Sequence, residues 1–353
     1  MPNKQIDLAR VSKEELLRLK ICDLPLTLKE NSLQGCIEEL YRELESKNIL
    51  FKPVCYLADE WLTPDEEPVI GIPFFLAHPA LAKLEREMMH IVEGGTRAWC
   101  MKLLRHEAGH AVNYAYRLYK RTHWRKVFGP FSREYGETYR FRPYSKNFVR
   151  HLEDYYAQYH PDEDFAETFA VWLTPDSDWA DRYHGWPVLR KLRYVDTLAR
   201  QIAGTRPKFA RGKRYWQLSS LRLTLASYYK RKKRLWAENF SDFYDSSLKR
   251  IFIEQPRSLF AYPAHEFVAR HRKVLLACVC SWTGERRFTV RRILDAIGKR
   301  CQVLHLVMRY DEQETMAHLA ACITTMAMNY LYTGRFGRKK QLCFTERDKE
   351  INA

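Results

Sequence analysis

The chain has 353 residues, of which 46% are hydrophobic and 29% are charged, so it is long and apolar enough to bury a full core. With only 14 Gly and 15 Pro, it is neither collagenous nor of low complexity. The net charge of +16 is concentrated in one part, because residues 1–200 hold 29 basic and 30 acidic side chains, whereas residues 201–353 hold 30 and 13. This excess predicts an acidic partner there, such as a nucleic acid, a membrane surface or an acidic protein.

Three features of the sequence favour a cytoplasmic protein without a membrane span. Residues 1–20 alternate charged residues with isolated leucines and lack the apolar core of a signal peptide. The longest uncharged stretch, 315–334, repeats its bulky apolar residues at helical spacing, which is typical of an amphipathic core helix. The nine cysteines are scattered and form no CxxC pair, so we expect reduced thiols.

Hydrophobic periodicity predicts an α+β chain that is mostly helical. Two stretches rich in β-formers, 50–57 and 69–76, predict the strands of a small mixed sheet. Pro73 marks the second as an edge strand or as a strand that begins there. Residues 121–150 are aromatic, basic and irregular, and we expect a domain boundary near 205–213, where the Gly, Pro and charge content shifts. Helices are expected at residues 11–20, 35–46, 79–92, 96–120, 161–174, 264–281, 289–306 and 312–332.

The sequence HEAGH at residues 106–110 is the strongest functional signal. Residues four apart lie on one face of a helix, so His106 and His110 can offer two imidazoles to one metal ion. Glu107 projects beside them and can hold a metal-bound water, which is the arrangement that a zinc hydrolase requires. The apolar residues around the motif are typical of a core helix that forms the floor of a cleft.

Catalytic zinc sites use three protein ligands, so a third ligand decides the interpretation. The segment HPDEDFAETFAVWL predicts a second helix, on which Glu163 and Glu167 are four residues apart and share one face. One carboxylate can bind zinc, and the other can accept a hydrogen bond from a ligand histidine. Two alternatives are open: the acidic residues only complement the positive end of the helix, or His151 or His160 is the third ligand.

HExxH followed by a helix with Glu-x-x-Ala-Glu resembles the gluzincin-type zinc metallopeptidases, the thermolysin and anthrax lethal factor kind. LLRHEAGHAV with HPDEDFAETFA is most similar to bacterial proteins described as zinc-binding metallopeptidases. The resemblance covers residues 68–175 and implies a zincin-like fold. The implied roles are the zinc ligands His106, His110 and Glu163, the general base Glu107, the transition-state stabiliser Tyr156 and, as hydrogen-bond partner of a ligand histidine, Glu167. Tyr155 and Tyr159 are close competitors of Tyr156 for the role of transition-state stabiliser.

The first functional hypothesis is therefore a zinc metallopeptidase that acts on a peptide or protein substrate. Zinc would polarise the scissile carbonyl and lower the pKa of its bound water, and Glu107 would pass the water's proton to the leaving amine. The edge strand around 70–75 would pair with an extended substrate, as the resemblance implies. Residues 1–95 would form the N-terminal α/β portion of the catalytic domain, 96–205 the catalytic helices with the zinc site, and 206–353 a basic helical C-terminal region.

The basic region supports a second hypothesis. Residues 201–250 hold 13 basic and 3 acidic residues interleaved with aromatic ones, a composition suited to phosphate contacts and base stacking. The protein would then be a nucleic-acid-associated binding protein with a structural or vestigial zinc site. Alternatively, these residues form an amphipathic helix whose lysines are merely solvated. His265 and His271 imitate a zinc motif, but a spacing of six residues places them on different helix faces.

Overall fold

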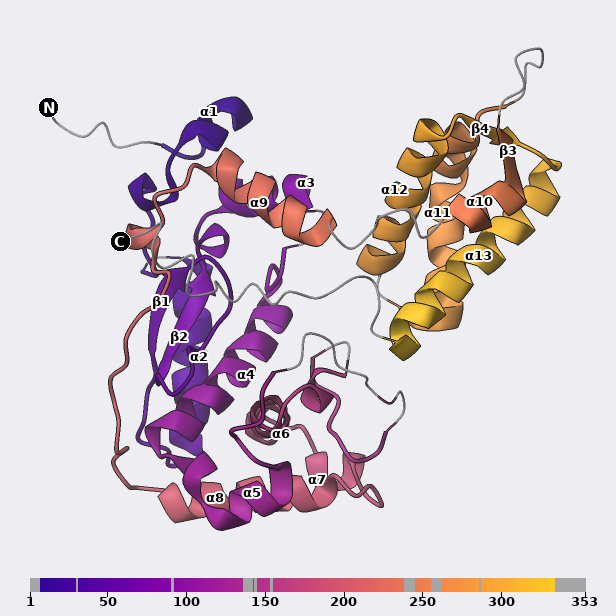
Figure 1. Ribbon diagram of the computed structural model, residues 1–353. Helices are drawn as coiled ribbons and strands as arrows, with labels where there is room; N and C mark the ends of the chain where they lie inside the picture. The colour runs from indigo at the N-terminus through magenta and orange to yellow at the C-terminus, as the bar shows by residue number, and fades with distance from the viewer. Residues whose placement is uncertain are drawn as a thin grey trace, which may run out of the picture. The chain divides into compact units, whose positions relative to one another are not determined.

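The computed structural model describes residues 7–29, 31–89, 92–135, 142, 145–152, 155–237, 245–254, 262–285 and 287–333. It is α+β, mostly helical, with two small two-stranded sheets. The described residues form two compact units (Figure 1). The described residues between 7 and 135 and between 145 and 233 belong to the first unit, whereas Arg142 and the described residues between 234 and 333 belong to the second.

Two parallel strands form the sheet of the first unit. β1 (Val54–Ala58) pairs with β2 (Val69–Pro73), and β2 is buried along its whole length. The edge of β2 is not free at Gly71, because this residue exchanges two backbone hydrogen bonds with Leu62, at 2.8 and 3.3 Å. The loop of residues 59–68 therefore covers β2 at this point. An extended substrate could therefore pair with β2 at Gly71 only if Leu62 moved away, and pairing elsewhere along 70–75 stays a prediction.

The helices of the first unit include those that the periodicity predicts, with ends that differ by a few residues. The helix expected at 96–120 ends at Ala115, and Arg117 then adopts a left-handed conformation with φ of 52°. Residues 121–150 are not irregular throughout, because they contain a short helix, α5. In chain order the helices are α1 (Lys13–Arg18), α2 (Ser32–Ser46), α3 (Pro79–Met89), α4 (Arg97–Ala115), α5 (Thr122–Phe128), α6 (Pro161–Leu173), α7 (Trp179–Arg182), α8 (Leu189–Ile202) and α9 (Leu225–Ala237), which continues past the unit boundary at residue 233.

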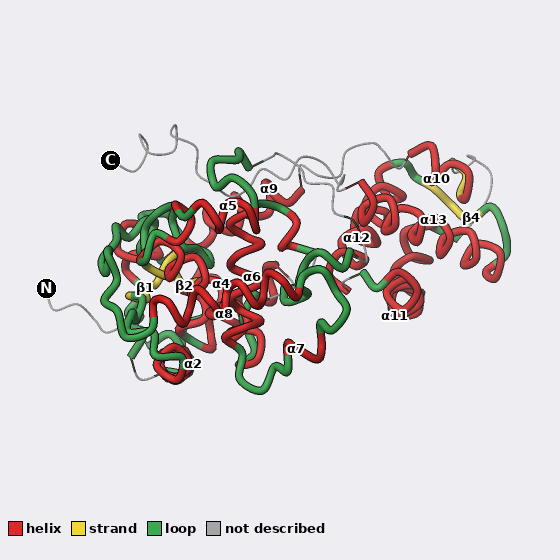
Figure 2. The backbone as a smooth tube through the Cα atoms, turned by 90° about the horizontal axis from the view of Figure 1, so that it is seen from below, coloured by secondary structure: helices red, strands yellow, loops and turns green. Residues whose placement is uncertain are grey.

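Helices α4 and α6 pack against each other in the middle of the first unit (Figures 1 and 2). All of α6 is buried, and so is α4 from Leu103 to Ala115 except for Arg105. The two backbones approach each other most closely beside Gly109, where an added Cβ would lie 2.8 Å from the Cα of Ala166. The glycine inside HEAGH is therefore a packing requirement of the two helices.

Local hydrogen bonds set the start of each central helix. The Thr96 hydroxyl caps α4, and Nδ1 of His160 caps α6 by accepting a hydrogen bond from the Asp162 N–H at 3.1 Å. Arg105 then ties α4 to α2, because its guanidinium donates two hydrogen bonds to the Glu43 carboxylate, at 2.5 and 2.8 Å. The Thr96 cap thus sets where α4 begins, and the bond between Arg105 and Glu43 holds α4 against α2.

The change in composition at 205–213 lies inside the first unit rather than between the units. After α8 the chain runs along β1 and is bonded to it. The Tyr56 hydroxyl donates a hydrogen bond to the Tyr215 carbonyl at 3.0 Å, and Ala58 forms a bridge with Gln217. The basic segment that follows residue 205 is therefore part of the unit that carries HEAGH.

The second unit is a helical bundle with a short antiparallel sheet. Its core contains Phe252, Phe267, Ile293 and Ile323, among others. The three helices expected in this part of the chain are confirmed. Among the described residues, no helix combines the length and apolar character needed to cross a bilayer. The elements are α10 (Asp245–Ile251), β3 (Phe252–Glu254), α11 (Ala264–Thr283), α12 (Arg287–Val303), β4 (Leu306–Met308) and α13 (Glu312–Thr333).

Candidate metal centre

Three side chains from the two central helices converge at one point. His106 and His110 lie one turn apart on α4, and Glu163 lies in the first turn of α6. The Nε2 atoms of the two histidines are 3.2 Å apart, and each is 3.2 Å from Oε2 of Glu163. All three side chains are buried. In the part of the chain that the structure describes, they form the one group of His, Cys, Asp and Glu side chains that could hold a metal ion.

The size of this triangle fits a tetrahedral metal ion. Zinc–ligand distances of about 2.0–2.1 Å place neighbouring ligand atoms about 3.3–3.4 Å apart in a tetrahedron. The observed separation of 3.2 Å along each edge is close to that value. Two imidazoles and one carboxylate also match the donor set of catalytic zinc sites, which leave a fourth position for water or substrate. The group can therefore hold a divalent ion.

A carboxylate of α6 fixes the ring of His106. The Nδ1–H of His106 donates a hydrogen bond to Oε1 of Glu167 at 2.8 Å, and the other oxygen of Glu167 accepts one from the Leu152 N–H at 2.8 Å. Because a carboxylate only accepts, Nδ1 carries the proton that points to Glu167, and Nε2 is the ring atom that can bind a metal ion once it has lost its own proton. Glu167 thus lies where its expected role as partner of a ligand histidine requires.

Asp162 fixes the ring of His110 in the way that Glu167 fixes that of His106. The sequence analysis did not assign this role to Asp162. The Nδ1–H of His110 donates to Oδ2 of Asp162 at 2.7 Å. Asn113 and Tyr114, which follow on α4, donate to the two oxygens of Asp162 at 2.7 and 2.5 Å. The polar Asn113 within the apolar sequence after HEAGH was the one signal that could have indicated a buried partner.

Glu107 is buried and follows His106 on α4, and its backbone carbonyl accepts a hydrogen bond from the Thr63 hydroxyl at 3.2 Å. Burial raises the pKa of the Glu107 carboxyl, whereas the charges of His106 and His110 lower it by less. Its pKa therefore lies above the ordinary value for a glutamate. A carboxylate in this environment is a stronger base than one in water, as general base catalysis requires.

Two tyrosine hydroxyls contact the other oxygen of Glu163. Tyr156 donates to Oε1 at 3.4 Å, and its ring lies 5.7 Å from that of His106. Tyr135, which the sequence analysis did not single out, donates to the same oxygen at 3.2 Å and stacks on His160 with ring centroids 3.9 Å apart. The competitor Tyr159 packs edge-on against Tyr135. Two phenols thus lie at the site.

The alternatives to Glu163 have other partners. Nε2 of His151 lies 2.9 Å from the Lys102 carbonyl. His160 uses Nδ1 as the cap of α6 and donates from Nε2 to the Arg133 carbonyl at 2.7 Å. Neither histidine belongs to the candidate metal group, so the carboxylate of Glu163 takes the third position.

The acidic first turn of α6 does more than complement the helix end. Asp162 and Glu163 face α4, and Asp164 forms a buried ion pair with Lys191 of α8 at 2.6 Å. Lys191 also donates to the Asn147 carbonyl at 2.8 Å. Burial raises the pKa of Asp164 to about 7, against the lowering effect of Lys191. All three acids are buried and bound to specific partners.

The site holds protons when no metal is bound. Burial alone lowers the pKa of His106, but the hydrogen bonds to Glu163 and Glu167 outweigh it and raise the pKa to about 9. At His110, Asp162 and Glu163 outweigh burial in the same way, and its pKa lies well above the ordinary value. Burial raises the pKa of Glu163, but the two histidines reverse this and hold it well below its usual range. A metal ion must therefore displace these protons.

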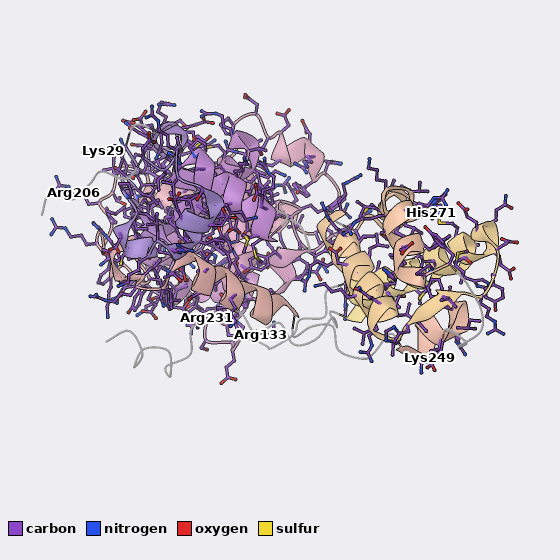
Figure 3. The ribbon with its side chains drawn as sticks, turned by 90° about the horizontal axis from the view of Figure 1, so that it is seen from above. Lys29, Arg133, Arg206, Arg231, Lys249 and His271 are labelled. Carbon is purple, nitrogen blue, oxygen red and sulfur yellow. The ribbon has the colours of Figure 1, made fainter. Side chains whose placement is uncertain are left out.

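Comparison with protein-family models, with curated proteins and with solved structures found no match to this chain. The resemblance to gluzincin-type metallopeptidases therefore stays a prediction. His265 and His271 lie on α11 of the second unit and belong to no candidate metal group within the described residues. Figure 3 labels His271.

Proposed function

We propose that the protein is a zinc-dependent metallopeptidase whose zinc ligands are His106, His110 and Glu163. The observation that carries the proposal is the triangle of donor atoms with edges of 3.2 Å, buried between α4 and α6. The proposal is further supported by the donor set, by the buried carboxylate of Glu107 and by the resemblance of the two helices to the gluzincin pattern. The fold we propose is accordingly zincin-like, with β2 against α4.

The residues of the chain would divide the chemistry as follows. Bound zinc supplies a Lewis acid that polarises the scissile carbonyl and acidifies a water molecule. Glu107 accepts the proton of the attacking water and delivers it to the leaving amine. The hydroxyls of Tyr156 and Tyr135 can donate hydrogen bonds to the carbonyl oxygen as its negative charge develops. Glu167 and Asp162 keep the two imidazoles in the orientation and tautomer that leave Nε2 free.

A purely structural zinc ion is less well supported. Structural zinc sites are closed by four protein ligands, usually including cysteine. The candidate group contains three ligands and no cysteine among the described residues. Glu107, next to the ligands, would be a costly buried carboxylate in a site with no chemistry to perform.

Metal content and hydrolysis, measured separately on the full chain, test this proposal. Wild-type protein should contain one equivalent of zinc and release new α-amino groups from a denatured protein substrate, and a zinc chelator should stop the release. His110→Ala should lose the zinc, because two ligands hold the ion poorly. If His110→Ala retains a full equivalent, the metal site is wrong. If zinc-loaded wild-type protein cleaves no peptide bond in any denatured substrate, the peptidase assignment is wrong although the metal site stands.

A further inference from the structure

A long segment without strands joins α8 to α9, and we call residues 203–224 the strap. Its regular structure is a single short turn of 3-10 helix, Leu218–Ser220. In Figure 1 it follows the outer side of the first unit past β1. Hydrogen bonds to its backbone, at 2.8–3.0 Å, hold it along its length: they join Gly204 to Asn48, Phe209 to Ala115, Tyr215 to Tyr56 and Leu223 to Ile21. Connections this long are usually functional or disordered, and the strap is anchored.

The strap and the start of α9 carry a dense row of positive charge. From residue 203 to residue 233 the chain holds ten Lys and Arg and no Asp or Glu. One of the ten, Lys232, is an internal anchor that pairs with Glu85 of α3 at 2.9 Å. Seven others are exposed and form no ion pair within the described part of the chain. These seven are Arg206, Lys208, Arg211, Lys213, Arg214, Arg222 and Lys230.

This arrangement differs from an amphipathic helix with solvated lysines. The cations from Arg206 to Arg214 lie on irregular backbone, so they are not the solvent face of a helix. Arg206 lies at the outer margin of the first unit (Figure 3). Neighbouring like charges with no acidic residue between them repel each other, which destabilises the folded state unless an anion lies across them. One carboxylate, that of Glu67, contacts the strap by accepting a hydrogen bond from the Lys213 N–H at 2.8 Å, so most of the strap's charge lacks a counter-charge within the described part of the unit.

Two aromatic residues near these cations each already have a cation over one ring face, which indicates how the partner is held. Lys213 lies over the ring of Tyr215 at 4.8 Å from its centroid, and Arg117 lies over the ring of Phe209 at 3.8 Å. Faces that hold a cation cannot stack on a base. An extended row of exposed cations instead matches a linear series of phosphates, which bind through charge without regard to base sequence.

We propose that the strap is a nucleic-acid-binding surface that contacts the phosphate backbone irrespective of base sequence. The base stacking expected from the composition plays no part in it. The surface belongs to the unit that carries the candidate metal centre, and it does not depend on whether that centre is catalytic.

Fluorescence anisotropy with the full chain and a labelled 24-base-pair duplex of mixed sequence tests the proposal between 50 and 200 mM salt. Each phosphate contact contributes about −0.9 to the slope of log affinity against log salt, so engagement of the seven cations predicts a slope of about −6. The variant with Lys208→Glu, Arg211→Glu and Arg214→Glu should lose about 3 units of that slope. Its affinity at 50 mM salt should fall by about 100-fold or more.

The matched control carries Lys83→Glu, Lys102→Glu and Lys126→Glu, which change the net charge equally on exposed positions of α3, α4 and α5. It should bind within a few-fold of wild type. Unchanged zinc content and circular dichroism in both variants show that the folded unit is intact. The proposal is overturned if wild type does not bind the duplex at 50 mM salt, if both variants weaken equally, or if anionic phospholipid vesicles bind in preference to the duplex.

Discussion

Gly109→Ala is the smallest change that tests how the metal centre is built. Gly109 lies between the two histidines on α4, and a Cβ at this position would lie 2.8 Å from Cα and 3.0 Å from the carbonyl oxygen of Ala166 on α6. These are backbone atoms, so no side chain can turn aside. Because non-bonded carbon atoms are most stable at about 3.5–4.0 Å, the two helices must separate locally by about 0.7 Å or more.

We expect this displacement to lower zinc affinity more than it lowers the stability of the fold. His106 and His110 come from one helix and Glu163 from the other, so separating the helices lengthens two edges of the ligand triangle. Metal sites tolerate ligand distances only within about 0.2 Å. We therefore expect zinc affinity to fall by at least about 10-fold. The strain of overpacking costs about 1–3 kcal/mol, against a gain of about 1 kcal/mol from replacing glycine by alanine within a helix.

Gly35→Ala is the matched control, since Gly35 lies in α2 and its added Cβ would meet nothing closer than Arg97 Nη1 at 3.7 Å. It should raise stability by up to about 1 kcal/mol and leave zinc binding unchanged. Competition against a chelating dye measures the zinc affinity. Denaturant unfolding of the chelator-treated proteins measures stability without the contribution of the bound metal. Wild-type zinc affinity and raised stability in Gly109→Ala would refute the close approach of α4 and α6.

Four further outcomes are expected. Glu107→Gln should retain zinc but lose hydrolysis, because the amide cannot accept a proton; wild-type turnover would contradict its role as base. Glu163→Ala should lose most of the zinc in a dye titration, whereas Glu167→Ala and Asp162→Ala should weaken affinity about 10–100-fold; the reverse order would exchange their roles. Tyr156→Phe should lower kcat about 100-fold at unchanged zinc content, and an equal loss confined to Tyr135→Phe would move the role to Tyr135. Metal-free protein should lose stability in denaturant unfolding as pH rises from about 6.5 through about 9, because the His106 imidazole stabilises the fold only while it is protonated and its pKa is raised. A pH profile of stability that His106→Gln leaves unchanged would contradict this.

Helical spacing could predict which candidate ligands share a helix face, whereas the choice of Glu163 over Glu167 rested on the resemblance to the gluzincin pattern. Residues 106 and 110, like 163 and 167, are four apart, so each pair shares a face once its helix forms. What spacing cannot supply is the alignment of one helix on the other. That alignment pairs Glu167 with His106 and Asp162 with His110, and it arises from the contact between Gly109 and Ala166. Spacing alone could therefore not assign Asp162 as the partner of His110.

Tyr135 and the cover over β2 were missed for a related reason. Both depend on loops whose course is set by tertiary contacts. Tyr135 reaches Glu163 because its loop is held by His160, which donates to the Arg133 carbonyl and stacks on the tyrosine ring. Leu62 reaches Gly71 because loop 59–68 turns back along β2. Neither event has a periodic signature, and a proline inside a predicted strand indicates an edge without indicating what covers it.

The charges buried between α4 and α6 connect the geometry of the centre with its chemistry. Glu107, Asp162, Glu163 and Glu167 are all buried, and ionised carboxylates in such a place destabilise a fold unless positive charge lies among them. The two imidazoles supply that charge when each is protonated, as the raised pKa values of His106 and His110 indicate. A divalent cation at the centre of the triangle supplies the same charge while leaving both imidazoles neutral. The carboxylates that orient the histidines therefore also make the pocket selective for a cation, and proton release is the necessary companion of metal uptake.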